Sequence, residues 1–161
     1  MSPTKSSDSP KIVSESGRVF ATFPAAVLAF IVNANEEFLL LRCARKGGWQ
    51  VPSGALESDE SPTEALEREL REELGTEFRH RLLGPVDVSS FQWDEKISLL
   101  SISFLVEYLG GAVTPGDDMV GAEVTWMPLE MITPQIPIAV PQNISHFTRA
   151  LRLFRQSHGD Q

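Results

Sequence analysis

The most constraining stretch of the sequence is SPTEALERELREELG, residues 61–75, because it carries signals for both ends and one face of a helix. Ser61 and Glu64 have the spacing of a capping box, and Pro62 stands at the first helical position, where its preset φ is favourable. Gly75 is placed to end the helix. Between these ends, four apolar residues form one stripe: Ala65, Leu66, Leu70 and Leu74. We therefore expect a helix that packs this stripe against a sheet.

The same helix concentrates carboxylates that should repel one another. Glu69 and Glu73 are spaced to share a face, and Glu72 adjoins it. Each like-charged pair costs about 0.2–0.5 kcal/mol on an exposed helix, so the cluster is either a solvated face or a site for positive charge. Oxygen ligands in this number suit Mg²⁺, which binds one or two carboxylates together with phosphate oxygens. Arg68 is spaced to pair with Glu72 or Glu64 and to orient the remaining carboxylates.

Runs of apolar, mostly branched residues surround this helix. Residues 24–33 and 37–45 predict a buried hairpin, and residues 78–95 and 96–109 predict two long strands. A further strand with a short turn or helix is expected over 122–132. The last element is an amphipathic helix marked by four apolar residues, Ile144, Phe147, Leu151 and Phe154. This order predicts an α+β or αβα layered domain.

Length and composition narrow the class of protein. The chain has 161 residues, 42% of them hydrophobic and 22% charged, which fits one soluble domain. We place this domain at 17–161 and expect a disordered tail over 1–16, which is rich in Ser, Pro, Lys and Asp. The net charge of −8 argues against binding duplex nucleic acid, whereas a small anionic ligand is compatible if a metal supplies positive charge.

The sequence also bears on the compartment. The single cysteine, Cys43, cannot form an intrachain disulfide, and residues 1–10 have no apolar signal segment. The longest apolar run, residues 25–32, is far shorter than the roughly 20 residues that a membrane span needs. We therefore expect a cytoplasmic protein without a membrane partner.

A longer pattern includes the acidic helix. Gly54, Glu60 and the run RELREELG at 68–75 match the Nudix box, G-x5-E-x7-R-E-U-x-E-E-x-G-U, in which U is a bulky aliphatic residue. Only the last position departs, with Thr76 in place of the aliphatic residue. The chain thus resembles the Nudix hydrolases. The resemblance implies a Nudix-type α/β/α sandwich with a mixed central sheet, a loop-helix-loop at the box and a C-terminal amphipathic helix.

The resemblance also implies an activity, namely Mg²⁺-dependent hydrolysis of a nucleoside diphosphate linked to another group, with Mn²⁺ as an alternative metal. Carried over by position, Glu69 and Glu73 become metal ligands, Glu72 a further ligand directly or through water, and the Gly54 carbonyl another. Arg68 and Glu72 are also expected to act in catalysis. Nucleoside triphosphates, nucleotide sugars, ADP-ribose and dinucleoside polyphosphates all stay open as substrates. Many family members are dimers, and exposed sheet edges here permit a homodimer.

Residues outside the box are candidates for further roles. For the general base we prefer Glu123, with Asp117 and Asp118 as alternatives, although Glu123 also fits a solvated edge charge. Substrate contacts are expected from two aromatic and two basic residues, Phe91, Trp93, Arg42 and Arg45. The aromatic pair would stack on a nucleobase, but packing across strands explains it equally well. The basic pair would hold a phosphate or sugar, or else form ordinary surface charge.

Two other classes of function compete with the hydrolase. The first is a Nudix-fold module that binds a nucleotide without turning it over. The complete set of Arg68, Glu69, Glu72 and Glu73 argues against it, because a binding module has no physical need for a costly carboxylate cluster. The second is an acidic interaction helix on an ordinary α+β scaffold, which predicts no metal-dependent change in stability.

Overall fold

A mixed six-stranded sheet forms the centre of the protein in the computed structural model, which describes residues 11–44, 47–93, 95, 97–132 and 144–159. Its strand order is β6-β7-β3-β4-β8, and β5 pairs with one end of β3. The strands are β3 Ala25–Val32, β4 Glu37–Arg42, β5 Ser53–Ala55, β6 Arg79–Gln92, β7 Ser98–Gly110 and β8 Glu123–Pro128. Two short 3-10 turns flank β8, η1 at Asp117–Met119 and η2 at Leu129–Met131.

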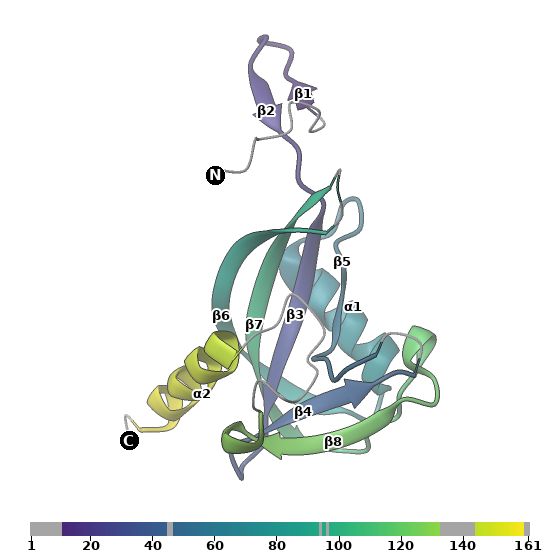
Figure 1. The fold of residues 1–161 in the computed structure, drawn as a ribbon, viewed down its shortest axis with the longest axis vertical. Helices are drawn as coiled ribbons and strands as arrows, with labels where there is room; N and C mark the ends of the chain where they lie inside the picture. The colour runs from purple at the N-terminus through teal and green to yellow at the C-terminus, as the bar shows by residue number, and fades with distance from the viewer. Residues whose placement is uncertain (1–10, 45–46, 94, 96, 133–143, 160–161) are drawn as a thin grey trace.

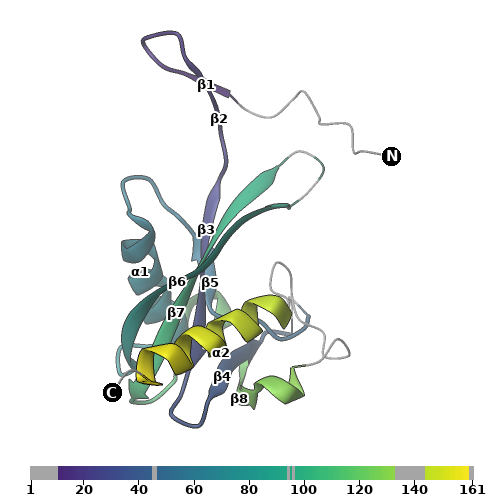
Figure 2. The ribbon, with the colours of Figure 1, turned by 90° about the vertical axis from the view of Figure 1, so that its left-hand side faces the viewer.

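Helices cover both faces of this sheet (Figures 1 and 2). Helix α1, Pro62–Leu74, lies on one face and helix α2, Ile144–Gly159, lies on the other. The predicted α+β fold with a mixed sheet, a loop-helix-loop at the box and a C-terminal helix is confirmed. Neither described helix has the length and apolar character that a membrane crossing requires.

Strand β3 contributes side chains to the cores on both faces of the sheet and so links the α1 layer with the α2 layer. It pairs in parallel with β7 and antiparallel with β4 and β5, so it is the most enclosed strand of the sheet. Alternate residues of a strand point to opposite faces. Val27 and Ile31 therefore pack in the core beneath α1, whereas Leu28 and Phe30 pack in the core beneath α2. A strand that is buried on both faces must be apolar throughout, as this one is.

The predicted ends of the box helix are present. The Ser61 hydroxyl accepts a hydrogen bond from the Glu64 amide, and the Glu64 carboxylate accepts one from the Ser61 amide, which completes the capping box. Gly75 ends the helix with a φ of +89°, in a region that favours glycine. The apolar stripe of α1 is buried in the core as expected.

The predicted disordered tail over 1–16 is wrong for residues 11–16. Strand β1, Lys11–Val13, and strand β2, Val19–Ala21, form an antiparallel hairpin that extends away from the body (Figures 1 and 2). The turn contains Gly17 at a φ of +82°. The polar composition of this segment concealed two short branched or aromatic runs on either side of a turn signal. Residues 1–10 lie outside the described residues.

Candidate active site

A cavity of about 530 Å³ lies beside β5 and is lined by residues of α1, β3, β5, η1 and the β6–β7 hairpin. One wall carries Glu69 and Glu73 of α1, with β5 beside them. Asp117 and Asp118 of η1 add two more carboxyl groups. An apolar wall comes from the β6–β7 hairpin and the start of β3, through Phe91, Trp93, Leu99, Ala26 and Leu28. The cavity therefore combines acidic groups with a flat apolar surface, and its volume suits a small organic ligand.

The two helix carboxylates that line this cavity are largely withdrawn from solvent. Glu69 is 9% exposed and Glu73 only 2%. The Ser53 amide donates a hydrogen bond to Glu73 Oε2 at 3.0 Å. Burial raises the pKa of Glu69, and the hydrogen bond from Arg68 opposes that rise. Burying ionised carboxylates is costly unless positive charge or hydrogen-bond donors compensate. The burial of Glu69 and Glu73 therefore requires such compensation.

Arg68 supplies part of that compensation by joining three carboxylates. Its Nε donates to Glu60 Oε1 at 2.6 Å, and its Nη1 donates to Glu69 Oε1 at 2.7 Å and to Glu72 Oε2 at 3.3 Å. Its Nη2 also donates to the Ala55 carbonyl at 3.0 Å, which ties the helix to β5. The hydrogen bond with Glu60 contributes most to raising the pKa of Arg68, and Arg68 lowers the pKa of Glu60. The guanidinium therefore fixes how Glu69 points.

Gly54 has a steric role in the same arrangement. A Cβ atom built on Gly54 would lie 1.9 Å from the Glu69 carboxyl group. Only glycine lets the β5 backbone approach this carboxylate so closely. The glycine at the first position of the box is therefore explained by its close packing against Glu69 of α1, independently of any metal contact.

The loop that carries Asp117 and Asp118 is fastened to the end of α1. The Gly116 amide donates to the Glu73 carbonyl oxygen at 3.2 Å, and the Thr114 amide donates to the last carbonyl of the helix at 2.9 Å. Asp117 has a φ of +51°, an uncommon backbone conformation for a residue other than glycine. The same helix thus positions both groups of carboxylates around the cavity.

The donor set matches the chemistry of a hard divalent cation, although the groups are not gathered around one point. Within the described ranges, no three His, Cys, Asp or Glu side chains stand close enough together to hold an ion as arranged. Glu69 is turned toward Arg68 and Glu73 toward the Ser53 amide. Carboxylate oxygens are nevertheless the ligands that Mg²⁺ prefers. To bind an ion these carboxylates would have to turn from their present partners, and the types of residue present fit a divalent cation.

The structure brings five of the ten predicted site residues together in one cavity. Glu69, Glu73, Gly54, Phe91 and Trp93 line one cavity. In contrast, the half-exposed Glu72 is not among its lining residues. Sequence reasoning also missed Gln50, a buried polar residue that lines the cavity without any motif to mark it.

Two predicted residues lie elsewhere, on the edge of the sheet. Arg42 Nη2 and Glu123 Oε2 form an ion pair at 2.6 Å across β4 and β8, and both side chains are exposed. The Arg42 guanidinium also lies 4.9 Å from the ring centroid of Trp49. Neither Arg42 nor Glu123 lines the cavity, because their cross-strand pairing directs them to each other. The predicted Arg45 and its neighbour Lys46 lie outside the described residues.

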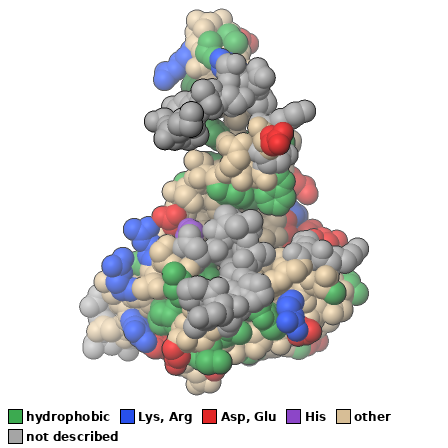
Figure 3. All heavy atoms as spheres, viewed as in Figure 1, with side chains coloured by type: hydrophobic (Ala, Val, Ile, Leu, Met, Phe, Trp, Pro, Cys, Tyr) green, Lys and Arg blue, Asp and Glu red, His purple; other side chains and the backbone are tan. Residues whose placement is uncertain are grey.

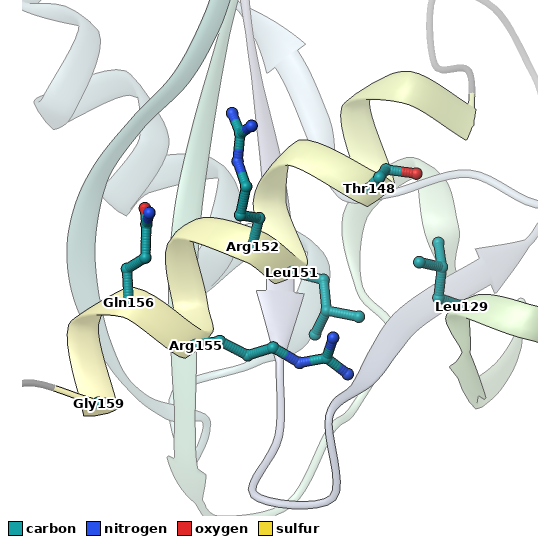
Figure 4. Close-up of a pocket in the computed structure, with 7 residues that line it drawn as sticks. All are labelled: Leu129, Thr148, Leu151, Arg152, Arg155, Gln156 and Gly159. Atoms are coloured by element: carbon teal, nitrogen blue, oxygen red, sulfur yellow. The ribbon is translucent and has the colours of Figure 1, made fainter.

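A second cavity, of about 750 Å³, lies along α2. Figure 4 shows the residues that line it, Leu129, Thr148, Leu151, Arg152, Arg155, Gln156 and Gly159. These residues include no carboxylate, and Arg155 is already paired with Glu36 through a hydrogen bond of 2.9 Å from its Nε. This cavity therefore does not offer the ligands of a divalent cation.

Comparison with known proteins gives a consistent result. A family model described as the NUDIX domain matches residues 22–150. An RNA pyrophosphohydrolase from Halorhodospira halophila (strain DSM 244 / SL1) is 46% identical over 61 residues, which cover 37% of this chain and 30% of that protein. An ADP-ribose pyrophosphatase from Methanocaldococcus jannaschii is 32% identical over 103 residues, 62% of this chain and 60% of that protein. The chain thus spans less than two thirds of the length of these curated relatives.

Solved structures agree on the fold. A MutT protein from Methanosarcina mazei Go1 superposes with a TM-score of 0.65 at 25% identity, covering 84% of this chain and 95% of that one. A UDP-X diphosphatase superposes with a TM-score of 0.67 at 21% identity, covering 89% and 68%. Because the family model spans well over half of the chain and contains the whole box, this protein belongs to the Nudix domain family.

Proposed function

We propose that this protein hydrolyses a phosphoanhydride bond of a nucleoside diphosphate derivative and requires Mg²⁺, or Mn²⁺ in its place. The observation that carries this proposal is the shared cavity, in which the buried Glu69 and Glu73 face a space also lined by Phe91 and Trp93. A pyrophosphate needs compensating positive charge, and a nucleobase needs a flat apolar surface. This one cavity contains carboxylates that could hold a cation and aromatic side chains that could contact a nucleobase.

In this proposal the ion is held by Glu69 and Glu73, with Glu72 and the Gly54 carbonyl as additional ligands. When bound, a divalent cation offsets phosphate charge and acidifies water, which is the chemistry that hydrolysis of a phosphoanhydride needs. Arg68 acts on the carboxylates rather than on the substrate, since its guanidinium already donates to Glu69 and Glu72. Its role is to limit the orientations that these side chains sample.

For the general base we now propose Asp117 or Asp118 in place of Glu123. Both aspartates line the cavity, whereas Glu123 is paired with Arg42 on the sheet edge. A base must come within hydrogen-bond reach of the proton that it removes from water. Separate Asp117→Asn and Asp118→Asn variants should therefore differ in kcat, with the base variant losing about 100-fold or more. Equal and small losses in both variants would exclude both residues.

The substrate is proposed to be a small nucleotide and not duplex nucleic acid. The net charge of −8 disfavours a polyanionic duplex. The relatives named above, an RNA pyrophosphohydrolase and an ADP-ribose pyrophosphatase, suggest two probes. We add nucleoside triphosphates, a nucleotide sugar and a dinucleoside polyphosphate, and we place the protein in the cytoplasm.

The test is product analysis of this substrate panel with Mg²⁺ and with a chelator, beside a Glu73→Gln variant. Phosphoanhydride cleavage that needs Mg²⁺ and is lost in Glu73→Gln is the expected result, and the best substrate then identifies the class. If no compound is cleaved while nucleotides still raise the melting temperature, the protein is a binding module and the hydrolase proposal is wrong.

A further inference from the structure

Gln50 is a polar residue that is buried inside the protein, with only 6% of it exposed. Charged side chains, in contrast, are spread over the face of the body that Figure 3 shows. The backbone of Gln50 is fixed to β4, because its amide donates to the Leu41 carbonyl at 2.8 Å and its carbonyl accepts from the Leu41 amide at 2.9 Å. Its chain neighbours Trp49 and Val51 pack in the core beneath α2, so the Gln50 side chain points to the opposite face of the sheet.

The Gln50 amide contacts Met119, the last residue of η1. Its Nε2 donates to Met119 Sδ at 3.4 Å. A thioether is a weak acceptor, and burying an amide is costly, so an apolar residue would serve stability better at this position. Apolar packing is non-directional, however, whereas a hydrogen bond restricts the geometry of its partner. Of the three residues of η1, Met119 is fully buried and Asp117 and Asp118 are exposed. Gln50 therefore contacts the residue through which η1 packs on the core.

The other end of η1 is fixed on helix α1 by Gly116. The Gly116 amide donates to the Glu73 carbonyl, and a Cβ atom built on Gly116 would lie 2.4 Å from the Glu72 carbonyl oxygen. The loop thus approaches the helix backbone more closely than a side chain would allow. Asp117 and Asp118 lie between these two fixed points, and the positive φ of Asp117 needs surrounding contacts to maintain it. Loss of either contact should therefore let the two aspartates move.

We propose that Gln50 is a positioning residue, which holds Asp117 and Asp118 at the cavity through its contact with Met119. This inference rests on the proposed function, because one of these aspartates is the base that we propose for hydrolysis. Gln50 and both aspartates line the same cavity, so a shift of η1 changes how the base meets the reacting water. A displacement of about 1 Å in a catalytic group can lower turnover about 100-fold. The rival role for Gln50 is direct contact with the substrate, and the two roles differ in what they require of Met119.

The first test compares kcat and KM for Gln50→Met, Met119→Leu and the variant that combines them. The first substitution removes the amide, the second removes the acceptor sulfur, and each keeps a side chain of similar volume. Each should lower kcat about 10-fold with KM little changed. The combined variant should lose no more than the larger single loss, because the two residues act as a unit. The matched controls Gln156→Met and Met131→Leu, at exposed positions that do not line this cavity, should keep wild-type kinetics.

Three kinetic results would overturn the proposal. A raised KM in Gln50→Met, with wild-type kinetics in Met119→Leu, would assign Gln50 to direct contact with the substrate. Losses that add in the combined variant would show that the two residues act independently. An unchanged kcat in both single variants would show that neither residue positions the base.

The second test follows η1 without substrate, by hydrogen exchange of individual backbone amides. The Met119 and Ala122 amides donate to carbonyls of the same turn, so their exchange reports the opening of η1. Both should exchange about 10-fold faster in Gln50→Met than in the wild type, whereas the Ala65 amide in the first turn of α1 should not change. Equal rates in η1 would overturn the proposal. Faster exchange in a chain that hydrolyses no nucleotide would confirm that Gln50 holds η1 and would contradict the proposed function alone.

Discussion

The two faces of the sheet are covered by helices of similar length. The helices differ in whether their charged side chains are buried or exposed. Helix α1 keeps Glu69 and Glu73 buried at the edge of its apolar core. Helix α2 buries Phe147 and Leu151, and its charges form exposed ion pairs such as that of Arg155 with Glu36. Both helices are amphipathic, so the patterning of apolar residues does not distinguish them.

This difference between the two helices is the reason why we propose the α1 carboxylates as the functional site. A buried carboxylate is costly when it is not fully compensated, whereas an exposed ion pair contributes about 0–1 kcal/mol. A chain selected only for stability would have no reason to keep the α1 arrangement, with a guanidinium joining three carboxylates beside a cavity. Perturbing the α1 face should therefore change activity, and perturbing the α2 face should change stability by small amounts.

The largest effect is expected from Gly54→Ala. The new Cβ would lie 1.9 Å from the Glu69 carboxyl group, so the carboxylate must move. A displaced catalytic group of this kind costs about 100-fold in kcat, and the overpacking costs about 1–3 kcal/mol of stability. Gly159→Ala on α2 is the matched control, because a Cβ there meets no atom within 4 Å. Both variants are measured by steady-state kinetics and thermal melts. Equal effects of Gly54→Ala and Gly159→Ala would contradict the functional difference that we propose between the two faces.

A smaller effect is expected from Arg68→Lys. Lysine keeps the positive charge but cannot donate in parallel to Glu60, Glu69 and Glu72, as the guanidinium does. We expect kcat to fall by about 10- to 100-fold because the proposed ligands lose their orientation. The control is Arg81→Lys, which changes an arginine paired with Glu107 away from the cavity. If Arg68→Lys retains full activity, the orienting role is wrong.

On the α2 face, Arg155→Gln should leave kcat and KM unchanged. It removes the exposed ion pair with Glu36, whose loss should change stability little because solvent screens both partners. Urea denaturation measures the stability change, and the substrate assay is run in parallel. A loss of activity comparable with that of Arg68→Lys would show that the second cavity takes part in function.

The smallest effect concerns pH. The Phe154 carbonyl and the Glu107 carboxylate accept from the two ring nitrogens of His158, and they raise its pKa above 6.5. Because the raised pKa belongs to the folded state, this stabilisation is complete below the ordinary pKa and is lost as the pH rises through the raised value. The difference in melting temperature between wild type and His158→Gln should thus be larger near pH 5.5 than near pH 8.5. An equal difference in melting temperature at both pH values would contradict this role of His158.

Local signals in the sequence were sufficient to predict much of the fold and the central residues of the candidate site. The capping box at Ser61, the stripe of α1 and the box carboxylates depend on residues within four positions of one another. Such contacts are set by helix geometry, so they can be read without knowledge of the rest of the chain. The same holds for Arg68 and Glu72, which pair at this spacing.

Features set by distant pairing could not be predicted in the same way. Arg42 and Glu123 are 81 positions apart, and only the register of β4 with β8 brings them together and away from the cavity. The placement of Asp117 and Asp118 likewise depends on hydrogen bonds between their loop and the end of α1. Register and loop docking follow from tertiary packing, which single-sequence patterns do not encode.

The most direct test of the central claim, that the buried carboxylates of α1 hold a divalent cation, is the shift in melting temperature on adding Mg²⁺. Binding at ten times the Kd stabilises the folded state by about 1.4 kcal/mol. We predict this shift for the wild type and for Glu107→Gln, which neutralises a largely buried carboxylate away from the cavity. Glu73→Gln should lose it. A shift of equal size in Glu73→Gln, or none in the wild type, would contradict the account.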